Sequence, residues 1–145
     1  MKKPITTLFM LMSVDGKIST GDNDALDVDK DFPQIAGVKE GLSQYYELEK
    51  QTDLFSMNTG RVFAKIGINE KTDEPPKLPV SFIVVDNEPY LENKGVEYLA
   101  KKAKTLFITT TNKKHPAFKI KKQMPNIEIL LYDKKEFSLG QFLML

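Results

Sequence analysis

The stretch that decides the fold spans residues 8–18 and reads Leu8-Phe9-Met10-Leu11-Met12-Ser13-Val14-Asp15-Gly16-Lys17-Ile18. Its apolar first half is typical of a strand that is buried on both faces of a parallel sheet, and we expect this strand over residues 5–12. Ser13, Asp15 and Gly16 then follow the carboxyl end of that strand. Ligands bind at this edge of open α/β sheets, so the stretch predicts either a ligand site or a plain turn after a core strand.

Strand-like and helix-like segments alternate along the rest of the chain. Apolar runs predict further strands over residues 53–57, 80–85, 105–111 and 126–132. Helical spacing of apolar residues predicts helices over residues 32–51, 62–66 and 95–103, whereas residues 113–123 are basic and are interrupted by Pro116. This alternation indicates βαβ crossovers, and hence an α/β fold with a mostly parallel sheet and helices on both faces.

The composition limits the class of protein. The 145 residues are 41% hydrophobic and 28% charged, which predicts a single domain over residues 1–145. A net charge of +1 argues against a nucleic-acid binder. The absence of cysteine excludes disulfides and thiolate metal sites and fits the cytoplasm. No stretch of the sequence is typical of a signal peptide or a membrane span, so we expect no membrane partner.

The lone histidine, His115, lies in the polar sequence Lys-Lys-His-Pro. We expect it at the surface, where a histidine has no catalytic partner. With one histidine and no cysteine, a zinc site would need mostly carboxylate ligands, which is unfavourable. Ser13 and Ser56 have no evident histidine partner in the sequence, so a serine hydrolase is also disfavoured.

A second turn, Asn58-Thr59-Gly60-Arg61, comes between a predicted strand and the helix that includes Val62. Backbone N–H groups at the start of a helix favour an anion, and the planar guanidinium of Arg61 matches a phosphate. The turn therefore predicts either a phosphate site or a left-handed turn at Gly60 with a solvated Arg61.

Polar residues also follow the next two predicted strands. Val85 and Asp86 end one strand, and the Asp86 carboxylate could hold a ribose hydroxyl. Thr109 and Thr110 end the other strand, with Lys113 and Lys114 shortly after them, and these residue types suit a cofactor ribose or phosphate. Threonines are also ordinary strand residues, and paired lysines are ordinarily solvated.

The sequence Ser-Val-Asp-Gly-Lys-Ile at residues 13–18 resembles the Ser-Leu-Asp-Gly-Lys-Ile signature of the pyrimidine reductases of riboflavin biosynthesis, which share the dihydrofolate-reductase-like fold. Thr59, Gly60 and Arg61 are similar, in altered order, to the turn of that superfamily that binds dinucleotide phosphates. The resemblance implies reduction of a phosphoribosylamino-pyrimidine by NADPH. It implies a catalytic Asp15, substrate contacts by Met12, Ser13 and Gly16, and cofactor contacts by Asn58, Thr59, Gly60, Arg61, Val62, Val85, Thr109 and Thr110.

The resemblance leaves other functions open. Phe9 and Leu11 occupy positions where the family usually has Lys and Ala, and the chain has no Trp for a pyrimidine loop. The resemblance covers only the first part of the family domain. Together with the apolar end at Phe142 to Leu145, this leads us to expect a domain truncated at its carboxyl end, which pairs as a homodimer. The alternatives are a catalytically silent nucleotide-binding or assembly module on the same fold, a dihydrofolate-reductase-like enzyme with another small-molecule substrate, and a generic nucleotide-binding α/β domain.

Overall fold

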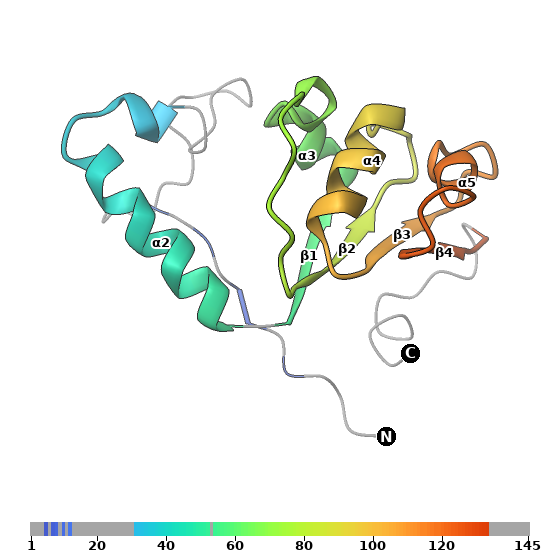
Figure 1. Ribbon diagram of the computed structural model, residues 1–145, viewed down its shortest axis with the longest axis horizontal. Coiled ribbons are helices and arrows are strands. Elements are labelled where there is room, and N and C mark those ends of the chain that lie inside the picture. The colour runs from blue at the N-terminus through green and yellow to red at the C-terminus, as the bar shows by residue number, and fades with distance from the viewer. Residues whose placement is uncertain are drawn as a thin grey trace. The chain divides into compact units, whose positions relative to one another are not determined.

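The computed structural model describes Ile5, Thr7, Leu8, Met10, Met12 and residues 31–52 and 54–133. These residues fall into two compact units, one within residues 5–53 and the other from Leu54 onward (Figure 1). The single domain expected over residues 1–145 stays a prediction.

The strand expected over residues 5–12 is absent from the described part of that stretch. Ile5, Thr7, Leu8, Met10 and Met12 belong to no strand, and Ile5 and Leu8 are 97% and 81% exposed. A parallel strand forms only where a neighbouring strand pairs with its backbone groups, so an apolar run does not by itself make one. The prediction of a strand buried on both faces is therefore wrong for these five residues.

Helix α2 (Val38–Thr52) confirms most of the helix predicted over residues 32–51. The predicted first turns form a separate 3₁₀ helix, η1 (Phe32–Gln34). The break lies at Gly37, whose φ of 85° is accessible to glycine but strained for other residues. The Gly37 N–H then donates to Oε2 of Glu40 at 2.7 Å, so a side chain of the first turn satisfies a backbone donor at the start of α2.

The second unit contains a four-stranded parallel sheet, which confirms the α/β fold class. Its strands are β1 (Phe55–Thr59), β2 (Ser81–Val85), β3 (Leu106–Thr110) and β4 (Ile127–Leu131). They lie in the order β1-β2-β3-β4, and every neighbouring pair is parallel. All four were predicted within two residues. Strands β2, β3 and β4 are rich in apolar residues, whereas β1 alternates apolar and polar residues before it ends at Asn58 and Thr59.

Helices connect these strands. They are α3 (Gly60–Lys65), the 3₁₀ helix η2 (Ile68–Glu70), α4 (Asn93–Lys102) and α5 (Ala117–Ile120). Right-handed crossovers between strands that follow one another across the sheet place all connecting helices on the same face. Figure 1 shows α3, α4 and α5 in this order across β1 to β4. Helices on the second face stay a prediction.

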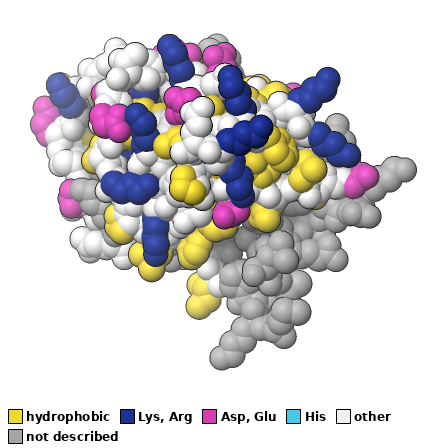
Figure 2. Space-filling model, turned by 45° about the vertical axis from the view of Figure 1, so that its right-hand side comes forward, with side chains coloured by type: hydrophobic (Ala, Val, Ile, Leu, Met, Phe, Trp, Pro, Cys, Tyr) yellow, Lys and Arg dark blue, Asp and Glu magenta, His cyan; other side chains and the backbone are white. Residues whose placement is uncertain are grey.

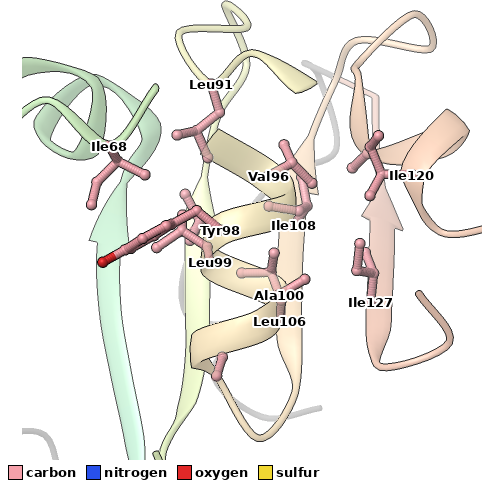
Figure 3. Packing of buried hydrophobic residues seen from close by; sticks show 13 residues of the cluster. Ile68, Leu91, Val96, Tyr98, Leu99, Ala100, Leu106, Ile108, Ile120 and Ile127 are labelled. Atoms are coloured by element: carbon pink, nitrogen blue, oxygen red, sulfur yellow. The ribbon is translucent and has the colours of Figure 1, made fainter. Parts of the chain in front are cut away.

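The core lies between the sheet and α4. The strand register aligns Phe82, Leu106 and Ile127 in one row across β2, β3 and β4. Figure 3 shows Leu106 and Ile108 behind α4, and Val96 and Leu99 of that helix are at most 1% exposed. The Asn126 amide donates to the carbonyl of Ala100 at 2.8 Å, which caps the carboxyl end of α4. The packed sheet and α4 support the loops that follow the carboxyl ends of the strands.

Candidate functional site

Three of the predicted cofactor-binding residues lie in one row at the carboxyl edge of the sheet. The register pairs Thr59 of β1 with Val85 of β2, and Val85 with Thr109 of β3. These three residues alternate with the core-facing ones, so they are on the face opposite α4. Thr59 is exposed, Val85 is half-buried and Thr109 is buried. The structure thus brings together residues that are up to 50 positions apart in the sequence.

The β1–α3 turn is tighter than expected, because α3 begins at Gly60 directly after the strand. The Thr59 side chain accepts a hydrogen bond from the Val62 N–H at 3.3 Å and so caps α3. The Asn58 Oδ1 accepts from the Thr59 N–H at 2.8 Å, which fixes the last residue of the strand. Gly60 has no positive φ, so the left-handed turn considered for it does not occur. Arg61 is exposed in the first turn of α3, where the helix dipole adds to its positive charge.

Gly60 is required by its contact with Asp86. A Cβ at Gly60 would overlap the Asp86 carboxylate, and both residues are buried. The glycine therefore allows β1 and α3 to pack against the loop after β2. A close approach of the backbone to a phosphate is not needed to explain it.

Asp86 connects three loops at this edge. Its carboxylate accepts hydrogen bonds from the N–H groups of Tyr90 at 3.1 Å and Leu91 at 3.0 Å. Nε2 of His115 lies 3.0 Å from the carboxylate Oδ2. With 1% of its surface exposed, Asp86 is out of reach of a ribose hydroxyl, so that proposed role is wrong. The Asp86 side chain points inward because its carboxylate satisfies the backbone N–H of Tyr90 and the buried N–H of Leu91.

His115 is buried, and the prediction of a surface histidine is wrong. Its Nδ1 accepts from the Ala117 N–H at 3.1 Å, so the ring proton is assigned to Nε2, which donates to Asp86. Both ring nitrogens are therefore engaged, and His115 acts as a structural link rather than as a base. The sequence signal that could have revealed this is the His-Pro pair directly before a helix, where a side-chain acceptor can cap a backbone N–H.

The two threonines at the end of β3 differ in their hydrogen bonding. The Thr110 hydroxyl donates to the Asp86 carbonyl at 2.6 Å and accepts from the Asn112 N–H at 3.1 Å. The Thr109 hydroxyl is buried and has no partner among the described residues. Thr110 thus holds the loop after β3. Thr109 is as buried as Asp86, so its hydroxyl is out of reach of a ligand in this arrangement of the loops.

A small hollow of about 390 Å³ lies beyond β2 and β3. We call it the β3-end hollow, and its lining residues are Asn87, Thr111, Asn112, Lys113 and Lys114. A larger hollow of about 820 Å³ lies next to it and shares Lys114, but acidic Glu70 and Glu92 also line it. The β3-end hollow is the more basic of the two.

Of the other predicted site residues, Ser13, Asp15 and Gly16 lie outside the described residues. Met12 is 54% exposed and belongs to the other unit, so its expected contact with substrate stays a prediction. Val62 is 37% exposed on α3, one residue after Arg61. The described parts of the chain contain no cluster of acidic or histidine side chains that could hold a metal ion.

None of the helices in the described ranges is long and apolar enough to span a membrane. Comparisons with protein-family models, with curated proteins and with solved structures found no match to this chain.

Proposed function

We propose that this protein is an NADPH-dependent reductase of a small-molecule substrate, similar to the pyrimidine reductases of riboflavin biosynthesis. The observation that carries the proposal is the row of Thr59, Val85 and Thr109 at the carboxyl edge, in which Thr59 is exposed and Val85 half-buried, with Arg61 exposed beside it. A parallel sheet binds nucleotides at this edge, and the exposed guanidinium of Arg61 in the first turn of α3 would pair with the phosphates.

Bound NADPH would supply a hydride, and the protein residues would position the two reactants and exclude water. Thr59, Gly60 and Arg61 would hold the dinucleotide phosphates, and Thr109 would lie near the adenosine half. Met12, Ser13 and Gly16 would contact the substrate, and Asp15 would orient it. The proposed substrate is a phosphoribosylamino-pyrimidine, whose ribose is reduced to a ribityl chain. We further propose a homodimer in the cytoplasm.

A nucleotide-binding module without catalysis is the second candidate. One observation favours this candidate. All described residues at the carboxyl edge of the sheet come from the unit of residues 54–133, whereas the proposed catalytic residue, Asp15, belongs to the other unit. Binding of a nucleotide would then need only the second unit.

An assay of reduced-nicotinamide oxidation with a phosphoribosylamino-pyrimidine separates the two candidates. The enzyme is expected to turn over, and Asp15→Asn is expected to lower turnover tenfold or more, which is about 1.4 kcal/mol in the barrier, with the melting temperature unchanged. Binding of NADPH without turnover for several phosphoribosylamino-pyrimidines and for dihydrofolate supports the module. An Asp15→Asn variant with wild-type turnover removes Asp15 from the site.

A further inference from the structure

The β3-end hollow presents two amide groups whose orientation the backbone determines. The Asn87 Oδ1 accepts from the Thr111 N–H at 3.1 Å and from the Tyr132 hydroxyl at 2.7 Å. The Asn112 Oδ1 accepts from the Lys114 N–H at 2.8 Å. A backbone N–H can only donate, so in each side chain the oxygen faces the backbone and the other position is an NH₂ donor.

The hollow therefore has donors but no acidic side chain. Its lining includes Lys113 and Lys114, both exposed, and neither ammonium group has a partner among the described residues. Outside the lining, Glu88 accepts a hydrogen bond from the Tyr90 hydroxyl at 3.1 Å, and Asp86 is buried. Figure 2 shows one face of the molecule, on which lysine and arginine side chains are interspersed with acidic and hydrophobic ones.

Two ammonium groups and two amide donors suit a doubly charged oxyanion with several acceptor oxygens, which describes a phosphomonoester. The hollow is shallow and open to solvent, so a phosphate can enter it while it is still attached to its sugar. Neighbouring strands lie about 4.8 Å apart, so the end of β3 is about 10 Å from the end of β1. One nucleotide can reach from the β1–α3 turn to the hollow.

We propose that the β3-end hollow binds a terminal phosphomonoester, with Asn87, Asn112, Lys113 and Lys114 as donors. The phosphate can belong to either of two molecules, the 2′-phosphate of a dinucleotide or the phosphate of a sugar-phosphate substrate. The two candidate molecules follow from the proposed reductase function. The proposal that the hollow binds a phosphate does not depend on that function.

Calorimetric titration with inorganic phosphate tests the site itself. Asn87→Asp keeps an oxygen for the Thr111 and Tyr132 bonds but replaces the amide donor with a negative acceptor. We expect this variant and the double variant Lys113→Gln/Lys114→Gln to bind phosphate about tenfold more weakly than wild type. The matched control is Lys104→Gln/Lys122→Gln, which changes the net charge equally at two exposed lysines outside the hollow, and it is expected to stay within about twofold.

The proposal is overturned if wild type binds no phosphate, if neither variant of the hollow weakens binding, or if the control loses as much affinity as the lysine variant. Because Lys113 and Lys114 are exposed, their variant keeps the test valid even if Asn87→Asp fails to fold.

Titrations with larger ligands identify the source of the phosphate. If the dinucleotide supplies it, wild type prefers NADPH to NADH by about tenfold and the lysine variant loses this preference. If the substrate supplies it, NADPH and NADH bind equally, and ribose 5-phosphate binds better than ribose. If neither dinucleotide binds while inorganic phosphate still does, the reductase proposal fails and the phosphate site stands.

Discussion

Asp86 shows how one residue organises the carboxyl edge. Its carboxylate contacts Gly60, accepts from Tyr90 and Leu91, and pairs with His115, so it joins the loops that follow β1, β2 and β3. The sequence places a polar residue after each strand, and this much was predicted. The inward orientation of Asp86 and His115 was not, because it depends on buried backbone donors that only the assembled loops create.

Thr109 and Thr110 form a matched pair for measuring the hydrogen bonds at this edge. Thr109→Val removes a buried hydroxyl that lacks a partner among the described residues, so the free energy of unfolding is expected to rise by about 1 kcal/mol. Thr110→Val leaves the Asn112 N–H without its acceptor, so the free energy of unfolding is expected to fall by about 1–3 kcal/mol. Urea denaturation measures both, and equal effects of the two changes would contradict this assignment.

Gly60→Ala tests the contact between the start of α3 and Asp86. The added methyl group would overlap the carboxylate, and the free energy of unfolding is expected to fall by about 1–3 kcal/mol. Gly41→Ala in α2 is the control, since nothing lies within 4 Å of the added Cβ there, and alanine favours a helix by about 1 kcal/mol. A Gly60→Ala variant with the melting temperature of wild type would contradict the close contact between Gly60 and the Asp86 carboxylate.

Among the elements, the four strands and α4 were predicted because apolar periodicity is sufficient to define them. The stretch at residues 5–12 shows the limit of this reasoning, since its apolar run predicts burial but does not supply a strand partner. For a related reason the short helix η2 was missed, and α5 was expected only as an optional helix within residues 113–123. Each has only three or four residues, too few for periodicity, and each depends on packing against α4.

Helix α4 is linked to the loop before β2 through Tyr98, whose hydroxyl donates to Oδ2 of Asp73 at 3.3 Å. Burial, and then the negative charge of Asp73, raise the pKa of Tyr98 above its ordinary value of 10.0. Because the pKa of Tyr98 is higher in the folded state than in the unfolded state, the protonated side chain stabilises the fold. This stabilisation is fully present below pH 10 and is lost as the pH rises through the pKa of the folded state.

The free energy of unfolding is therefore expected to fall above about pH 10, and Tyr98→Phe is expected to reduce the slope of that fall. Denaturation curves of both proteins from neutral to alkaline pH measure the two slopes. An unchanged slope in Tyr98→Phe would contradict the role of the Tyr98–Asp73 pair.

For the molecule as a whole, the parallel sheet and its carboxyl edge belong to residues 54–133, whereas the stretch with the family-like signature belongs to residues 13–18. The fold class and the position of the edge could be predicted, because both follow from the order of strands and polar turns. The chemistry at residues 13–18 rests on the resemblance alone, since it depends on side chains outside the described residues.

Calorimetric titration of the full chain with NADPH tests most directly whether the carboxyl edge binds a dinucleotide. Wild type is expected to bind, and Arg61→Ala is expected to weaken binding by about 1.5–3 kcal/mol, the range for hydrogen bonds to a charged group. Lys104→Ala, at an exposed lysine before the amino end of β3, is expected to change it by less than about 0.5 kcal/mol. No binding by wild type, or equal losses in the two variants, would contradict a dinucleotide site at the start of α3.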